Sequence, residues 1–133
     1  MNSVTVINSL QALAELNQAF DLYEDALVHS KVDVLDPLFC NSPHTLRYGA
    51  KENLSSYDEI KAFRAARPSA GLSRHILQRH IVTFGTHMGA PNVTLVRSSE
   101  PRVSRQSQTW VKFDLEFSNG WRVVSAHVSW MDS

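Results

Sequence analysis

The sequence is poor in cysteine and has no long apolar run. Cys40 is the single cysteine, so no disulfide can form within the chain. No apolar stretch approaches the ~20 residues that a helix needs to cross a bilayer. The first residues do not show the basic stretch and apolar segment of a signal peptide. We therefore expect a cytoplasmic protein with reduced thiols, in which Cys40 is a small buried side chain rather than a nucleophile.

Neither sign of charge dominates the chain. Lysine and arginine together number 13, as do aspartate and glutamate, which argues against a nucleic-acid or membrane-surface partner. Arginine is nevertheless concentrated in the middle of the sequence, and two interpretations stay open: a solvated face with ordinary ion pairs, or a cavity that attracts anions. The arginines in question are Arg64, Arg67, Arg74, Arg79, Arg97, Arg102 and Arg105.

Several signatures of enzyme chemistry are also missing. His75 and His80 have no acid at metal-ligand spacing, so we expect no metal site. The chain has no glycine-rich phosphate loop and no serine-elbow motif, so we do not expect a covalent triad. We expect a protein that works without a cofactor.

The first half of the chain is predicted to be helical. Apolar residues recur at three- and four-residue steps from Leu10 to Leu27, which indicates an amphipathic helix that ends near His29. A short helical piece is expected at 32–35, reaching toward residue 39, and a strand at 44–48, with 52–55 as a connector. Ser56, with Glu59 three residues on, predicts the start of a third helix that Pro68 stops.

The second half is predicted to form strands. Segments 73–86, 92–96, 103–117 and 121–130 are rich in β-branched and aromatic residues. Turn signals separate them at 89–91, 98–101 and 118–120, and Asn119-Gly120 is the clearest hairpin signal. No linker divides the chain, so we expect one domain over residues 1–133.

This order of elements predicts an α+β fold. Three N-terminal helices would pack on one face of a strongly curved antiparallel sheet. A bent sheet wrapped around a long helix leaves an internal pocket between the two, and such pockets commonly bind ligands.

Arg47 and Tyr23 are the first candidates for that pocket. Arg47 stands in the middle of a short expected strand, and arginine is rarely buried unless an anion meets it. Its alternative role is a structural ion pair with Glu52 or Asp21. Tyr23 falls on the apolar stripe of the first helix, where it is either a core residue or a site hydroxyl. Arg67 and Arg74 are candidates for a second anion clamp.

The last two strands offer further polar candidates. Gln106, Gln108 and Trp110 share one strand face, which suits either a pocket wall or a polar dimer surface. His127 on the final strand is either a wall residue or a structural histidine.

Several motifs carry a resemblance to known families. Residues 101–111 and 120–129 resemble the cone-shaped superfamily typified by nuclear transport factor two (NTF2), which has a cystatin-like fold. Four blocks in order resemble the AtzH/HpxZ family more closely. The blocks are DVLDPLF at 33–39, TLRYGAKEN at 45–53, YDEIKAFRAARP at 57–68 and RQSQTWV at 105–111.

This resemblance implies a function that the residue patterns alone do not. The family includes a decarboxylating amidohydrolase that converts 1,3-dicarboxyurea to allophanate, and it accompanies amidase-signature enzymes in cyanuric acid and oxalurate catabolism. It assigns catalysis to a helical tyrosine and a strand arginine, which match Tyr23 and Arg47. The expected substrate is a small anion, and the expected assembly a homodimer or higher homo-oligomer. The alternative is a non-catalytic binding or accessory module associated with an amidase.

Overall fold

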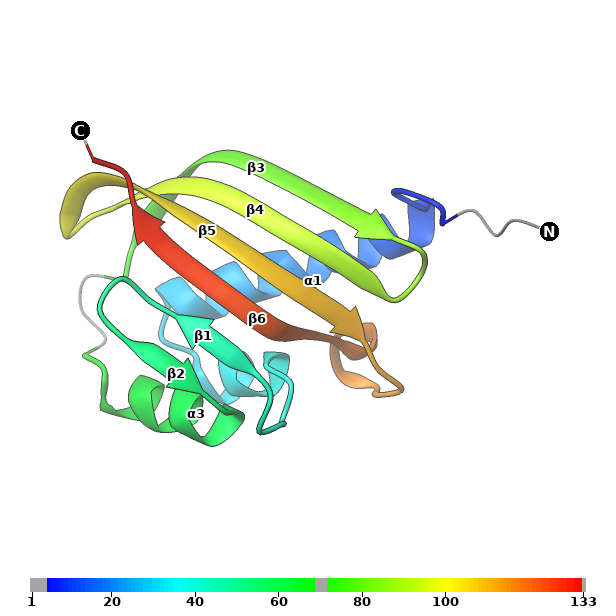
Figure 1. Ribbon diagram of the computed structural model, residues 1–133, viewed down its shortest axis with the longest axis horizontal. Coiled ribbons are helices and arrows are strands. Elements are labelled where there is room, and N and C mark those ends of the chain that lie inside the picture. Colours follow the sequence, from blue (N-terminus) through cyan, green and yellow to red (C-terminus); the bar gives the residue numbers. More distant parts are fainter. Residues whose placement is uncertain (1–4, 69–71, 133) are drawn as a thin grey trace.

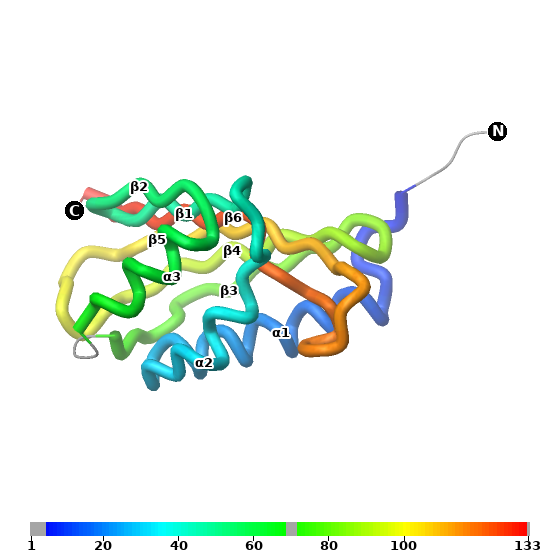
Figure 2. Tube along the Cα trace, turned by 90° about the horizontal axis from the view of Figure 1, so that it is seen from below, coloured from blue at the N-terminus to red at the C-terminus, as the bar shows by residue number. Residues whose placement is uncertain are grey.

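The computed structural model describes residues 5–68 and 72–132, with three helices on one face of a six-stranded sheet (Figures 1 and 2). The helices are α1 (Leu10–Val28), α2 (Val32–Leu35) and α3 (Tyr57–Ala66), and short 3-10 turns η1 (Asp36–Leu38) and η2 (Phe117–Gly120) complete the helical elements. The strands are β1 (Leu46–Tyr48), β2 (Asn53–Ser55), β3 (Arg74–Phe84), β4 (Met88–Arg97), β5 (Glu100–Lys112) and β6 (Trp121–Trp130).

The expected cystatin-like, NTF2-like α+β fold is confirmed, with one correction to the sheet. The strand order is β2-β1-β6-β5-β4-β3, and β1 runs parallel to β6, so the sheet is mixed rather than wholly antiparallel. Residues 53–55, expected as a connector, form strand β2 against β1. Three residues are too few for an alternating pattern to reveal a strand, which explains the wrong expectation.

Helix α1 forms where its apolar stripe predicted. The Ser9 hydroxyl accepts from the Ala12 backbone N–H at 3.3 Å and caps the N-terminus. One face of the helix is buried, with Leu16 and Phe20 fully inaccessible to solvent, and it packs against the sheet, where Trp110 is equally buried. The third predicted helix is also present, and the Ser56 hydroxyl accepts from the Glu59 N–H at 3.1 Å.

The turn expected at 89–91 is wrong, because those residues lie inside β4. A Cβ on Gly89 would come within 2.3 Å of Leu16 Cδ2, so this glycine permits close packing of α1 on the sheet. Pro91 pairs with Ile81 in the ladder. The reversal between β3 and β4 occurs instead at Gly85, whose positive φ of 65° suits glycine.

The predicted reversal at 118–120 is present between β5 and β6. Ser118, Asn119 and Gly120 all have positive φ, with values of 55°, 54° and 84°. Strand β5 ends at Lys112 rather than at residue 117, so the connection is longer than a two-residue hairpin. Among the described residues, no helix has both the length and the apolar character needed to span a bilayer.

Candidate functional site

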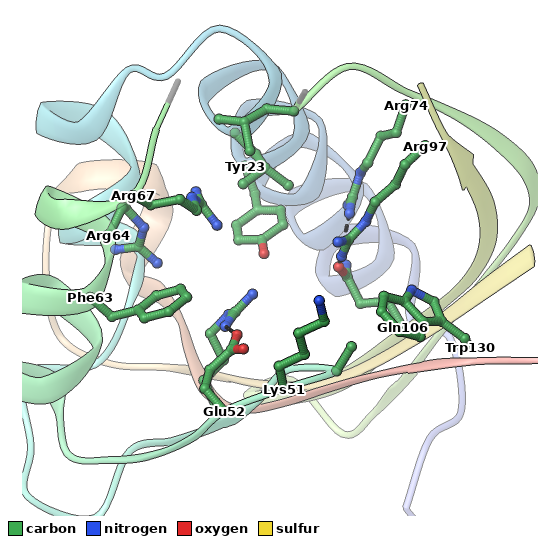
Figure 3. Close-up of a pocket in the computed structure, with 14 residues that line it drawn as sticks. Tyr23, Lys51, Glu52, Phe63, Arg64, Arg67, Arg74, Arg97, Gln106 and Trp130 are labelled. Carbon is green, nitrogen blue, oxygen red and sulfur yellow. Dashed lines mark hydrogen bonds and ion pairs between the residues drawn. The ribbon is translucent and has the colours of Figure 1, made fainter. Parts of the chain in front are cut away.

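A cavity of about 260 Å³ lies between the C-terminal half of α1, helix α3, the segment after β1 and the four long strands (Figure 3). Its wall is formed by fourteen residues, and basic groups outnumber acidic ones. The basic residues that line it are Arg47, Lys51, Arg64, Arg67, Arg74 and Arg97, against the one acidic lining residue Glu52. Four of the seven arginines clustered in the middle of the sequence therefore line a cationic cavity, which was one of the two interpretations of that cluster.

Two of these arginines are held by carboxylates behind the wall. Arg64 is bonded to Asp36, and both side chains are buried. Arg74 is bonded to both carboxylate oxygens of Glu24 and donates through Nη1 to Gln106 Oε1 at 3.2 Å. An arginine whose N–H donors bond to other side chains has few donors left for a ligand, so Arg74 stabilises the cavity wall more than it could bind an anion.

Arg47 forms an ion pair within the cavity itself. Its Nη1 donates to Glu52 Oε1 at 2.7 Å, which matches the structural alternative for this residue, whereas Asp21 pairs with Arg79. Gly49 makes the pair possible, because a Cβ there would lie 1.9 Å from Glu52 Oε1. This guanidinium makes no other hydrogen bond to a described residue, so its remaining N–H groups can meet a bound anion.

Three of the six basic residues that line the cavity have no ion-pair partner anywhere in residues 5–68 and 72–132. They are Arg67, Arg97 and Lys51. Burial lowers the pKa of Arg67, and the nearby charges of Arg47 and Arg64 lower it further. The pKa of Arg97 is lowered by burial and then by Arg74 and Arg47. A bound anion would relieve this repulsion.

Tyr23 combines both roles considered from the sequence. Only 4% of the residue is exposed, and its ring packs in the core against Phe20, Phe39 and Trp110, with centroid distances of 6.0, 6.1 and 6.1 Å. Its hydroxyl points into the middle of the cavity (Figure 3). The ring is therefore held rigidly while the oxygen stays available for a ligand.

The predicted site residues divide into two groups. Tyr23, Arg47, Arg67, Arg74 and Gln106 all line the cavity. The other three do not, and they are Gln108, Trp110 and His127.

Physical reasons account for the positions of these three residues. Gln108 and Trp110 lie deeper in the core, where Trp110 Nε1 donates to Gln108 Oε1 at 2.8 Å. His127 pairs with Ser107, which faces away from Gln106, and it contacts Tyr48 on the exposed side of the sheet. Side chains alternate between the faces of a strand, and the register that decides the face was not known from sequence.

Some lining residues were not predicted as site residues. Lys51, Phe63 and Trp130 gave no distinct signal, but Arg97 did. It follows Val93 and Leu95 at two-residue steps, and both of those are buried, so strand alternation directs Arg97 to the same face. No group of three or more His, Cys, Asp or Glu side chains within the described parts of the chain could hold a metal ion.

Comparisons with known proteins place the chain among relatives of the same fold. The AtzH-like family model matches residues 5–133. A structure of a protein of unknown function from Pectobacterium atrosepticum, of the DUF3225 family, is 45% identical, with 95% of each chain covered and a TM-score of 0.89. A cystatin-like fold protein from Burkholderia xenovorans is 31% identical, with 98% of this chain and 99% of that chain covered and a TM-score of 0.89.

More distant structures share the fold alone. An NTF2-like protein of unknown function from Pseudomonas putida is 10% identical, with 91% of this chain and 87% of that chain covered and a TM-score of 0.72. A search of curated proteins found no match.

Proposed function

Because the chain belongs to the AtzH-like family, we propose that it is a cofactor-free enzyme that releases carbon dioxide from a small N-carboxylated urea. Conversion of 1,3-dicarboxyurea to allophanate is the leading candidate, and hydrolysis of a related acyl urea such as oxalurate is the alternative reaction. The observation that supports this most is the Tyr23 hydroxyl in a small cavity lined by more cations than carboxylates.

The charge of the cavity favours a dianion. Arg67, Arg97 and Lys51 have no carboxylate partner among the described residues, and 1,3-dicarboxyurea carries a carboxylate at each end. Oxalurate carries one carboxylate and would leave more of the positive charge uncompensated. Arginine meets a carboxylate through two parallel N–H donors, which fixes its orientation as well as its position.

The proposed reaction needs one proton and no cofactor. The bond between the urea nitrogen and the carboxylate carbon breaks, its electron pair stays on nitrogen, and the carboxylate leaves as carbon dioxide. Tyr23 donates the proton that the nitrogen takes up, and water then restores the phenol. The Arg47 guanidinium lies in the same cavity and stabilises the negative charge that develops on the urea oxygen and nitrogen.

The decisive experiment is turnover by the purified protein. Fresh 1,3-dicarboxyurea and, separately, oxalurate are incubated with the protein, and carbon dioxide and ammonia are measured against the uncatalysed rate. We expect carbon dioxide without ammonia from dicarboxyurea. Tyr23→Phe should lower the rate by roughly 10²- to 10⁴-fold, the usual contribution of a general acid, without loss of the fold.

Tyr48 in strand β1 provides a matched control for Tyr23. Tyr48 is 40% exposed and contacts His127 on the outer face, so Tyr48→Phe should keep full activity. Normal turnover by Tyr23→Phe would contradict the assigned role. Tight binding of the dianion with no rate above the uncatalysed reaction would favour the other candidate, a binding module that works with an amidase.

A further inference from the structure

One side of the cavity holds hydrogen-bond donors that no other group in the described part of the chain uses. Gln106 Nε2 and Trp130 Nε1 are both buried, both belong to lining residues, and neither has an acceptor within the described chain. Arg97 lines the same side and makes no ion pair with any described residue. Figure 3 shows Arg97, Gln106 and Trp130 together on the β4–β6 side, with Arg67 on the α3 side of the Tyr23 hydroxyl.

The orientation of the Gln106 amide follows from its neighbour. Arg74 Nη1 lies 3.2 Å from Gln106 Oε1, and a guanidinium can only donate. The oxygen must therefore face Arg74, which leaves the amide N–H₂ group as the free end. Arg74 itself is held by Glu24, so this orientation does not depend on a ligand.

Trp130 is also fixed before any ligand binds. The Arg102 guanidinium lies 4.0 Å from the ring centroid, and Lys51 Nζ lies 5.9 Å from it. These contacts set the plane of the indole, and with it the direction of the N–H. A buried N–H without an acceptor is destabilising, and an acceptor on a ligand would remove that cost.

We propose that Arg97, Gln106 and Trp130 form a carboxylate-binding subsite, which holds one end of a two-ended dianion while Arg67 and Arg47 hold the other. All three groups present donors only, and an ionised carboxylate is an acceptor only. Arg67 lies across the Tyr23 hydroxyl from this subsite, so a dianion that reaches both would pass its central atoms beside the phenol. The inference rests on the proposed function, to which it adds the residues that select a dianion.

Binding of stable analogues tests the subsite without catalysis. Glutarate has three chain atoms between its carboxylates, as does 1,3-dicarboxyurea, and butyrate is the same chain with one carboxylate. Isothermal titration calorimetry should show that the wild-type protein prefers glutarate. Arg97→Gln should weaken glutarate binding roughly 10- to 100-fold, the value of a charge-assisted hydrogen bond, and change butyrate binding little.

Arg105→Gln provides the matched control. Arg105 is exposed on the same strand as Gln106 and points to the opposite face, so its removal changes the net charge equally and should leave both affinities unchanged. Trp130→Phe keeps an aromatic ring and removes the N–H, and it should reduce the glutarate preference by roughly 2- to 10-fold. If circular dichroism shows that Arg97→Gln does not fold, Trp130→Phe tests the subsite in its place.

Failure of the subsite is distinguishable from failure of the enzymatic proposal. A wild-type protein without preference for glutarate, or folded Arg97→Gln and Trp130→Phe proteins that keep it, would overturn the subsite even if dicarboxyurea is turned over. Loss of the preference in these variants supports the subsite even if the wild-type protein shows no turnover.

Discussion

The two halves of helix α1 bring charged groups into very different surroundings. Near its N-terminus, Glu15 accepts from Lys112 Nζ at 2.8 Å, from Trp121 Nε1 at 3.0 Å and from Gln11 Nε2 at 3.1 Å. Near its C-terminus, Tyr23 faces a cavity in which basic side chains outnumber acidic ones. In the first region the charged groups are bonded to other groups of the protein, whereas in the second several cations have no carboxylate partner among the described residues.

This difference separates charges that stabilise the fold from the charges that we propose to bind a ligand. Burial acts to raise the pKa of Glu15, but the hydrogen bonds from Lys112, Trp121 and Gln11 outweigh it and lower that pKa below its usual value of 4.5. The protein therefore gains stability by keeping Glu15 ionised. Arg67 and Arg97 gain no such compensation, because burial lowers the pKa of both and the largest charge effects on them come from other arginines, which lower it further.

The largest expected effect on stability comes from breaking the ion pair between Arg64, which lines the cavity, and Asp36. Asp36→Asn removes the carboxylate that meets Arg64 and leaves the buried guanidinium without a counter-charge, beside the Phe39 ring at 4.6 Å. We expect a loss of about 3–5 kcal/mol in the free energy of unfolding, measured by urea denaturation. Asp114→Asn, at an exposed position, is the control and should be neutral. A loss below about 1 kcal/mol in Asp36→Asn would show that the cavity tolerates another uncompensated cation.

A smaller effect is expected at the other end of α1. Glu15→Gln should cost about 1–2 kcal/mol at neutral pH, since it weakens the hydrogen bonds that tie α1 to β5 and β6. The folded-state pKa of Glu15 is depressed, so the stability it provides is full above the unfolded value of 4.5 and is lost as pH falls through the folded pKa.

The pH dependence of this variant tests the direction of the Glu15 pKa shift. The difference in unfolding free energy between wild type and Glu15→Gln should shrink as the pH falls below about 4.5. Glu116→Gln, at an exposed site in the connection to β6, should show no such trend. A difference that grows toward low pH would mean that Glu15 is not held ionised in the folded protein.

The fold could largely be predicted from local patterns, because each one had a direct physical cause. The apolar stripe of α1 and the Ser56 cap of α3 are both local signals, and both appear where expected. Strand β2 could not be predicted because its three residues are too few to show an alternating pattern, and the place of Gly89 could not be predicted because it depends on a contact with a distant part of the chain. For Gly89 that contact is Leu16, far earlier in the sequence.

The site residues could be predicted only where the sequence indicates which face of a helix or strand they lie on. Tyr23 was placed by the helical stripe, and Arg47 and Gln106 by polar positions in expected strands, and all three line the cavity. The face of His127 stayed open in the sequence because the sheet register was unknown, and the ladder pairs this residue with the outward-facing Ser107. The unpaired state of Arg97 could not be foreseen, since it depends on which carboxylates the fold brings near.

The smallest expected effect on stability is at an uncompensated cation. Arg67→Gln removes a positive charge that lies among Arg47, Arg64 and Arg97, and it breaks no ion pair within the described residues. We expect the free energy of unfolding to stay within about 1 kcal/mol of wild type and to shift upward, because like-charge repulsion falls. Added glutarate should raise the midpoint of thermal unfolding of the wild-type protein more than that of Arg67→Gln, since a ligand stabilises only the form that binds it. Differential scanning fluorimetry with and without glutarate measures both quantities. A strongly destabilised Arg67→Gln protein would place Arg67 with the structural pairs and remove the contrast between the two ends of α1.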